Sequence, residues 1–294
     1  MRDNQESAAG NPLGEVHASP DRYSPDVLFP IARASAREAI GLTSALEMQG
    51  FDHWQAFELS WLDSGGKPQV AYADLFFSAD SPSIVESKSL KLYLNSFNHE
   101  RLTSWAALEE TLSADLSSAS GAPVVVRLAN LVDYRARVAA QWQAPHGPAE
   151  NTVQHLVNLD SYSLIPDVAP LDQSILLCEP LAGAQTGEQV FVSDLFRSNC
   201  PVTNQPDWAS IEIRLQGVSV EPSSLLSYLC SFRNHQGYHE ECAERIFKAL
   251  SERCAPSSLR ISMNYLRRGG LDINVYRASY ALEFSQALPR AIRQ

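Results

Sequence analysis

One nine-residue segment occurs twice in the chain, and this repetition restricts the possible folds more than any other feature. Residues 89–97 read SLKLYLNSF and residues 224–232 read SLLSYLCSF, with six of the nine positions identical. The copies begin more than 130 residues apart, whereas solenoid repeats recur about every 20–50 residues. The 294-residue chain is long enough for two domains of ordinary size. The sequence therefore predicts two modules of similar structure.

The second copy lies in a region where the pattern of apolar residues can be followed from end to end. Alternating apolar residues indicate strands, and apolar residues spaced three and four apart indicate amphipathic helices. The two glycines in the sequence RRGG at 267–270 suit a hairpin turn. The predicted order is ββααββ, with strands at 208–215 and 217–220, helices at 225–232 and 239–254, and strands at 259–266 and 271–280.

The first copy begins in the same way, but its last strand is not located. Runs that start at Trp54 and Trp208 are interpreted as equivalent, and residues 132–197 contain a Pro-rich connection and further β-like sequence. The fold class is therefore α+β, with two tandem modules of antiparallel sheet and helices packed on one face of each sheet. The predicted elements are strands near 55–62 and 68–77, helices near 89–98 and 105–118, and a strand at 123–131.

Three regions are expected along the chain. Residues 1–24 are rich in Gly, Pro and Ser and predict a loosely ordered leader, followed by the first module at 25–145 and the second at 146–294. The leader has no apolar core of the kind found in signal peptides, and no apolar run approaches the roughly 18 residues of a membrane span. We expect a cytoplasmic protein with no membrane partner.

Charge and cysteine content narrow the function further. The formal net charge of −11 argues against direct binding to nucleic acid, because phosphate contacts need clustered Lys and Arg. The five cysteines are an odd number without CxxC spacing, in a chain large enough to need no covalent cross-links. This pattern predicts reduced thiols.

Cys200 is the most distinctive of these cysteines. It precedes Pro201 in a polar segment, and a residue before proline is disfavoured in a helix. A loop thiol with an acid close behind it in sequence is a candidate nucleophile. The thiolate is the reactive form, and an ordinary pKa of about 8.5 leaves little of it at neutral pH, so Cys200 needs a base or a positive neighbour. Asp207 could exchange that proton, or it could simply close the turn before Trp208.

His235 and His239 raise the question of a metal site. They lie four residues apart, and with Cys200 or Cys242 they could form a zinc site. The glycine between the histidines and the lack of a recognised ligand spacing argue against this interpretation, so we expect no metal.

Three further motifs have both a structural and a functional interpretation. Glu240 lies in the first turn of the predicted helix at 239–254, where a carboxylate offsets the helix dipole. The sequence ESKS at 86–89 is typical of a helix start. Arg267 and Arg268 beside two glycines could solubilise a hairpin tip or bind a phosphate. No GxGxxG follows a strand, so a Rossmann cofactor site is unsupported.

Four separated segments together resemble the two-module form of the QueF family of nitrile reductases, and the resemblance runs from about residue 10 to the C-terminus. It implies a tunnelling fold of ββααββ units and a homodimer. It also implies the NADPH-dependent conversion of 7-cyano-7-deazaguanine to 7-aminomethyl-7-deazaguanine in the queuosine modification of tRNA. The segments are VESKSLKLYLNSF (85–97), SNCPVTNQPDW (198–208), SFRNHQGYHEECAERIF (231–247) and YLRRGGLDIN (265–274).

The resemblance also implies roles for individual residues. Cys200 matches the thiol that adds to the nitrile carbon to form a covalent thioimide, and Asp207 matches the proton donor to the nitrile nitrogen. Glu86 and Glu240 match anchors for the purine-like edge, since a carboxylate can accept two hydrogen bonds. His239 would lie beside the reacting nitrogen.

The remaining roles concern the pocket wall and the cofactor. The backbone of Val85 to Ser87 would line the substrate pocket. The NADPH contacts would be Ser87, Lys88, Arg268 and Gly269, with the cations on the phosphates.

Two alternatives remain open from the sequence. A tunnelling-fold relative of the GTP cyclohydrolase type would act on a purine or pterin with metal-activated water, and stoichiometric zinc would favour it. A non-catalytic purine-binding module would bind the deazapurine without oxidising NADPH.

Overall fold

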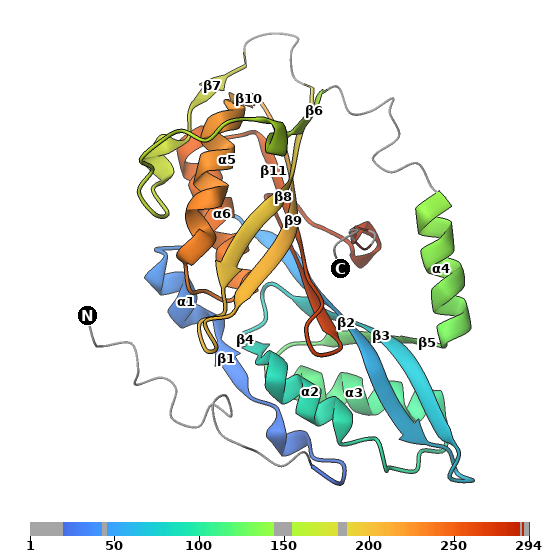
Figure 1. Ribbon diagram of the computed structural model, residues 1–294. Coiled ribbons are helices and arrows are strands. Elements are labelled where there is room, and N and C mark those ends of the chain that lie inside the picture. Colours follow the sequence, from blue (N-terminus) through green and yellow to red (C-terminus); the bar gives the residue numbers. More distant parts are fainter. Residues whose placement is uncertain (1–19, 43–45, 144–154, 182–186, 289, 291–293) are drawn as a thin grey trace.

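Strands from both halves of the chain form one eight-stranded sheet in the computed structural model (Figure 1). The structure describes residues 20–42, 46–143, 155–181, 187–288, 290 and 294. Neighbouring strands are antiparallel except for β6 and β8, which are parallel. The strands run in the order β5 (Val124–Ala129), β3 (Pro68–Ser78), β2 (Gln49–Leu62), β12 (Leu271–Ala278), β11 (Ser258–Tyr265), β9 (Pro206–Gln216), β8 (Gln189–Asn199) and β6 (His155–Asn158).

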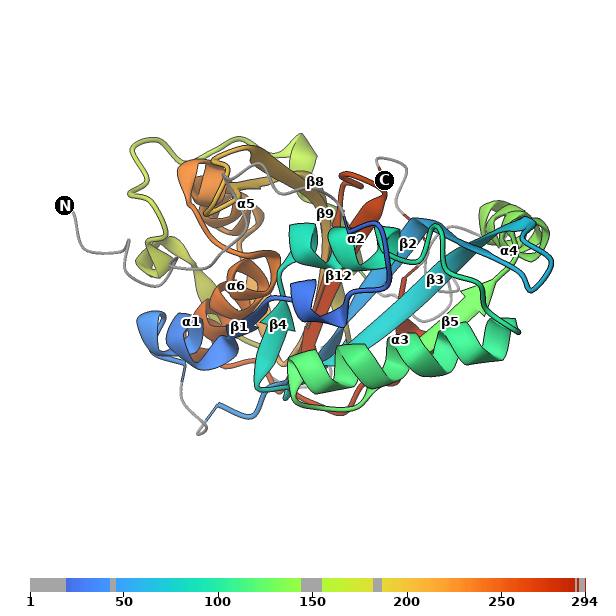
Figure 2. The same ribbon diagram turned by 90° about the horizontal axis from the view of Figure 1, so that it is seen from below.

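Four helices cover one face of this sheet, α2 (Ser87–Asn95) and α3 (Trp105–Ser120) in the first half and α5 (Pro222–Cys230) and α6 (His239–Cys254) in the second. Figure 2 shows α2 and α3 against β2, β3 and β5. The apolar stripes predicted for these helices are buried, including Leu90 and Tyr93 in α2 and Leu225 and Tyr228 in α5. Together with the inward side chains of the strands they make one continuous core.

Other elements lie outside this two-layer core. Helix α4 (Leu131–Gln143) contacts the opposite face of the sheet, where Arg137 donates to Asp74 of β3. Helix α1 (Arg33–Ala39) packs against α6. No helix in the described ranges is long and apolar enough to cross a membrane. Short 3-10 helices span Pro25–Val27, Leu159–Ser161, Gln173–Ile175, Ser231–Asn234 and Phe284–Gln286.

The two halves repeat fine details as well as the element order. The register of β2 and β3 shifts between Ala56 and Leu59, and that of β8 and β9 shifts between Ser193 and Phe196, so each half has a bulge in its first hairpin. Each half also adds a two-stranded sheet, from β1 (Pro30–Ala32) and β4 (Ser83–Val85) and from β7 (Cys178–Pro180) and β10 (Val218–Val220). The predicted duplication and the α+β class are confirmed.

Several details of the prediction are wrong. Trp54 lies in the first strand of its half and Trp208 in the second strand of its own half, so the two are not equivalent. The strand predicted at 217–220 exists as β10 but pairs with β7 outside the main sheet. The first strand of the second half is β8, and residues 132–143, which belong to the region described as containing β-like sequence, lie in helix α4. Within the described residues, no fourth strand of the first half follows β5 beside it.

The cysteine prediction is wrong for one pair. Cys178 and Cys254 form a disulfide, with their Cα atoms 5.3 Å apart, whereas Cys200, Cys230 and Cys242 are free. Strand β7 contacts α6, and this brings together two cysteines separated by 76 positions. Sequence spacing alone does not show such a contact.

The predicted region boundaries stay predictions. Most of the leader, residues 1–19, and the boundary at 145 lie outside the described residues. At the end of the leader, the Tyr23 ring lies 5.2 Å from that of Phe97, and its hydroxyl donates to Asp115.

Candidate functional site

Cys200 follows the last residue of β8, at the start of the turn that leads into β9. Its backbone N–H donates to the carbonyl of Gln205 at 2.8 Å, and its carbonyl accepts from the N–H of Asn204 at 2.9 Å. Ser198 pairs with Asp207 in the register of the hairpin. Because side chains alternate along a strand, Cys200, Ser198 and Asp207 belong to the same face of the sheet, the face covered by helices.

Asp207 is buried and makes an ion pair across the sheet. Arg268, from the turn between β11 and β12, donates from Nη1 to Oδ1 of Asp207 and from Nη2 to the side-chain oxygen of Gln205. Tyr265 pairs with Ala209 at the ends of β11 and β9, and this register brings the β11–β12 turn to the start of β9. The structure therefore joins Arg268, predicted as a cofactor contact, to Asp207, predicted as a proton donor.

His239 is the first residue of α6 and lies next to the same carboxylate. Its Nε2 is 3.9 Å from Oδ2 of Asp207, and its ring meets the ring of Tyr265 edge-on with the centroids 4.1 Å apart. Burial lowers the pKa of His239 below its ordinary value, and the positive charge of Arg268 lowers it further, whereas Asp207 raises it in part. The imidazole is therefore neutral at neutral pH.

Glu240, the second residue of α6, is a buried carboxylate with one unused oxygen. Its side chain is almost fully buried, and Oε1 has no hydrogen-bond partner. Burial and the negative charge of Asp52 raise the pKa of Glu240 to about 7, although Arg33 and Arg277 act to lower it. A buried acceptor without a partner in a native structure points to a ligand or to stored strain.

Glu86 caps α2 from the first half of the chain. Its Oε1 accepts from the N–H of Lys88 at 2.9 Å and its Oε2 from the N–H of Ser89 at 2.7 Å. Glu221 caps α5 in the same way, accepting from the N–H groups of Ser223 and Ser224. The duplication thus contains two equivalent carboxylate caps, and Glu86 is the one that is buried.

Tyr238 connects the two halves of the site. Burial and the negative charges of Glu86 and Cys200, followed by those of Glu240 and Glu241, raise its pKa to about 12. Tyr238, which directly precedes α6, therefore interacts electrostatically with the cap of α2 and with the residue that follows β8. Val85, at the end of β4, is buried beside Glu86, and Ser87 is exposed at the first position of α2.

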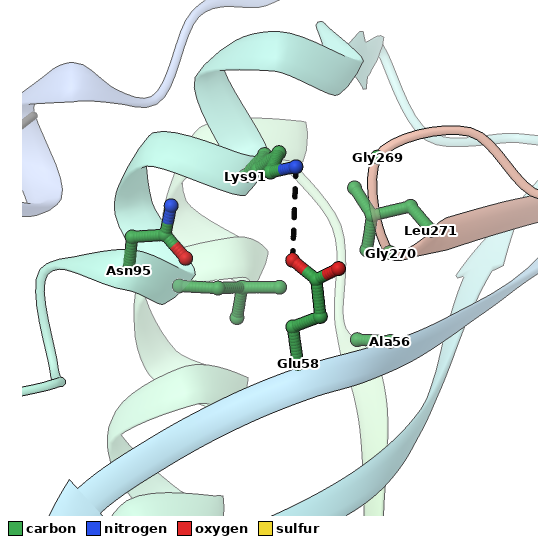
Figure 3. A pocket seen from close by; sticks show the side chains of 8 residues that line it. Ala56, Glu58, Lys91, Asn95, Gly269, Gly270 and Leu271 are labelled. Atoms are coloured by element: carbon green, nitrogen blue, oxygen red, sulfur yellow. Dashed lines mark ion pairs between the residues drawn. The ribbon is translucent and has the colours of Figure 1, made fainter.

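The turn after β11 faces α2 across a small hollow (Figure 3). Gly269 has φ +59°, and a Cβ atom there would lie 2.9 Å from Nζ of Lys91. Lys91 in turn forms an ion pair with Glu58 at 3.6 Å. Lys88 lies three residues before Lys91, on the same side of α2. Gly269 of this exposed turn and Lys91 of α2 therefore lie close together, and Ser87 and Lys88 precede Lys91 in the same helix.

Comparison with known proteins decides the family. The family model described as "Nitrile reductase, 7-cyano-7-deazaguanine-reductase N-term" matches residues 19–128, and the one described as "QueF-like protein" matches residues 206–283. A protein named NADPH-dependent 7-cyano-7-deazaguanine reductase from Burkholderia cenocepacia is 44% identical over 272 residues, covering 92% of this chain and 94% of the relative. A protein of the same name from Burkholderia multivorans is 45% identical over 270 residues, which cover 92% of this chain and 93% of the relative.

The chain belongs to the QueF family.

The matched segments of the QueF family models contain most of the predicted site. Glu86 and Lys88 lie in the first segment, and Asp207, Glu240 and Arg268 lie in the second. Cys200 lies six positions before the second segment begins. A search of solved structures finds the apo form of the archaeosine synthase QueF-Like, with 14% sequence identity and a TM-score of 0.30. The match covers 35% of this chain and 100% of the archaeosine synthase chain.

The zinc interpretation gains no support from the geometry. His235 pairs with Glu241 at 3.2 Å, and His239 faces Asp207 and Tyr265 instead. Among the residues that the structure describes, no three His, Cys, Asp or Glu side chains gather as a metal site would require.

Sequence reasoning missed three neighbours of this QueF site. Gln205 fixes the guanidinium of Arg268, Tyr238 lies between the two halves, and Tyr265 packs on His239. Gln205 and Tyr238 stand within two residues of predicted site residues, and that proximity in sequence was an available signal. Tyr265 lies in the strand predicted at 259–266, and its contact with His239 depends on how α6 packs on that strand, which the sequence does not show.

Proposed function

We propose that this protein reduces 7-cyano-7-deazaguanine to 7-aminomethyl-7-deazaguanine with two NADPH, as a step of queuosine biosynthesis for tRNA. The observation that carries the proposal is the 44% identity, over 92% of the chain, to a reductase of that name. The test follows nicotinamide absorbance with the purified protein and the nitrile, and quantifies the amine. We expect two NADPH oxidised per amine, and a protein that forms no amine would refute the proposal.

Cys200 is the nucleophile of this proposal. Its sulfur bonds to the nitrile carbon, the C≡N bond becomes C=N, and the thiol proton passes to the nitrogen. A nitrile accepts hydride poorly, and this addition replaces one difficult step by easier ones. NADPH would supply a hydride twice to the former nitrile carbon. After the first transfer the Cys200 sulfur leaves as a thiolate, which regains a proton from solvent, and an imine remains; with the second transfer the imine nitrogen takes up one further proton.

Asp207 carries the proton between sulfur and nitrogen. The carboxylate is ion-paired with Arg268, and the hairpin aligns it with the face that bears Cys200. It can therefore take the thiol proton and deliver it to the nitrile nitrogen. His239, which is neutral, lies within 3.9 Å of this carboxylate, where it can hydrogen-bond the nitrogen that gains the proton.

Glu240 and Glu86 hold the guanine-like edge of the substrate. The free Oε1 of Glu240 can accept from an N–H of the ring or its amino group. Glu86 already accepts two backbone N–H groups, but each carboxylate oxygen has a second lone pair. The backbone of Val85 to Ser87 forms the wall beside Glu86.

Ser87, Lys88, Arg268 and Gly269 are the proposed contacts to NADPH. The glycine turn exposes its backbone, and Lys88, Lys91 and Arg268 supply positive charge around it, so the residues present suit a phosphate-bearing cofactor. Arg268 would then have to share its guanidinium between Asp207 and a phosphate. No metal is part of the proposal.

We place the protein in the cytoplasm as a homodimer, with no membrane or direct nucleic-acid partner. The net charge of −11 supports the absence of nucleic-acid binding, and the family resemblance supports the dimer. Sedimentation velocity tests the assembly, and a single monomeric species at working concentration would refute the dimer.

Asp207→Asn should lower kcat by about 100-fold or more while the Kd of the nitrile changes by no more than a few-fold, because a proton carrier acts mainly in the transition state. Steady-state kinetics and a binding titration measure the two quantities. Asp172→Asn, at the N-cap of the short 3-10 helix Gln173–Ile175, is the control and should keep wild-type kcat. Near-normal turnover by Asp207→Asn would show that the assigned role is wrong.

Glu86→Ala and Glu221→Ala form a matched pair. Each removes the cap of one of two equivalent helices and should cost about 1 kcal/mol of unfolding free energy. Only Glu86→Ala should also weaken nitrile binding, by about 10-fold or more, because it removes acceptors that are charged. Urea unfolding and titration of the nitrile test both effects. If both variants bind the nitrile with equal affinity, Glu86 caps α2 but does not bind the substrate.

A further inference from the structure

Five charged side chains form a buried ionic network between the two halves of the chain. Arg277 of β12 donates from Nη1 to Asp52 of β2 at 2.7 Å and from Nη2 to Glu244 of α6 at 2.9 Å. Arg33 of α1 pairs with Asp52 at 2.5 Å, and Arg37 pairs with Glu244 at 2.8 Å. All but Arg37 are almost fully buried.

This buried ionic network has three positive and two negative members, so it has one excess positive charge. Glu240 lies one helical turn before Glu244, on the same face of α6. An ionised Glu240 balances the excess. The charges of Arg33 and Arg277 act on Glu240 in the stabilising direction, and that of Asp52 opposes them.

Arg33 is the member with an unused donor. Its Nε donates to Oγ of Ser81 at 3.1 Å and its Nη2 to Asp52, so the guanidinium is fixed in place. Its Nη1 is buried without a hydrogen-bond partner, as is Oε1 of Glu240. Buried polar atoms without partners are rare, and here a donor and an acceptor occur on two side chains that interact electrostatically.

We propose that Arg33 is a positioning residue for substrate binding, whose guanidinium supplies the counter-charge that keeps the carboxylate of Glu240 ionised and turned toward the deazaguanine edge. This inference rests on the proposed function. A protonated Glu240 has lost part of its acceptor capacity, whereas the ionised form can accept a ring N–H and an amino N–H together. Arg33 thus extends the site from the second half of the chain to the start of the first.

The charge of Glu240 depends on groups from every element around it. Burial and Asp52 of β2 raise its pKa to about 7, although Arg33 of α1 and Arg277 of β12 act to lower it. Tyr238 before α6 and Tyr265 of β11 also face it, and both are neutral because burial raises their pKa values. Removing the positive charge of Arg33 raises the pKa of Glu240 further. As the solution is acidified, the variant should therefore lose its affinity for the substrate at a higher pH than the wild-type protein does.

The experiment measures binding of the nitrile by calorimetry in a Cys200→Ala background, which excludes the covalent step, between about pH 6 and pH 9. Arg33→Gln should move the midpoint of the pH dependence up by about one unit, from about 7, and so weaken binding about 5-fold at pH 7, with affinity recovered in base. With Cys200 intact, the same change should raise KM more than it lowers kcat.

Arg37→Gln is the matched control, because Arg37 is partly exposed and pairs with Glu244 rather than Glu240. Its pH midpoint should move clearly less than that of Arg33→Gln, because Arg33 and Arg277, and not Arg37, are the arginines that act on Glu240. Arg33→Lys keeps the charge and should keep the wild-type midpoint, and it provides the test if Arg33→Gln does not fold. A midpoint that is unmoved in Arg33→Gln, or moved equally in Arg33→Lys, overturns the inference. Wild-type protein that neither binds nor reduces the nitrile instead refutes the proposed function.

Discussion

Replacing Cys200 with alanine is expected to lower nitrile reduction by roughly 10³-fold or more, because the covalent route through the thioimide is lost. The same change should abolish the adduct that wild-type protein forms when it is mixed with the nitrile without NADPH. Intact-mass spectrometry detects the adduct, and nicotinamide absorbance measures the rate. Undiminished amine formation by this variant would contradict the central step of the proposal.

Cys230→Ala is the control for this experiment. Cys230 is a free, half-buried thiol at the end of helix α5, and burial raises its pKa above the ordinary value. Burial raises the pKa of Cys242 still further. Both thiols are therefore poor nucleophiles at neutral pH, since the thiolate is the reactive form. Cys230→Ala should keep both the adduct and the wild-type rate, and loss of the adduct in this variant would place the reactive thiol elsewhere.

The fold was predictable where local patterns persist. Helix α6 was predicted with the bounds that the structure has, because its apolar stripe continues over four turns. Strand β8 was missed because its bulge between Ser193 and Phe196 exposes two consecutive residues and interrupts the alternation. Trp54 and Trp208 were matched by residue type alone, and only the sheet shows that they lie in different strands of their halves.

The site was predictable as far as its motifs are local. Cys200 and Asp207 stand at the two ends of one turn, and Glu86 and Glu240 stand at helix starts. The ion pair between Asp207 and Arg268 joins residues 61 positions apart and depends on β9 and β11 being neighbours. Asp52 and Arg277 are 225 positions apart and meet because β2 of one half pairs with β12 of the other. The periodicity of apolar residues in a single sequence indicates where strands lie along the chain, but it does not show which strands are neighbours in the sheet.

Arg277→Met is expected to be the most destabilising single change in the buried ionic network. Removing one partner of a buried ion pair leaves a charge without compensation and costs about 3–5 kcal/mol. Arg277 is fully buried and binds Asp52 and Glu244 at once, although Arg33 and Arg37 stay as second partners. Urea unfolding measures the loss, and the pairing of β2 with β12 at this point means that both halves should unfold together.

Lys248→Met in α6 is the control, because it removes an ion pair with Glu252 at the helix surface and should change stability by less than about 1 kcal/mol.

The dependence of stability on acid pH should separate Arg277→Met from Lys248→Met. Burial alone would raise the pKa values of Asp52 and Glu244, but Arg277 and its fellow arginines outweigh it and hold both below their ordinary values. A carboxyl group whose pKa is lower in the folded state than in the unfolded state stabilises the fold at pH values above its unfolded-state pKa. This stabilisation is lost as the pH falls through the folded-state pKa. Wild-type protein and Lys248→Met should therefore lose stability steeply below about pH 4, whereas Arg277→Met, having already lost this contribution, should lose less. Parallel acid profiles for all three proteins would mean that Arg277 does not stabilise these carboxylates.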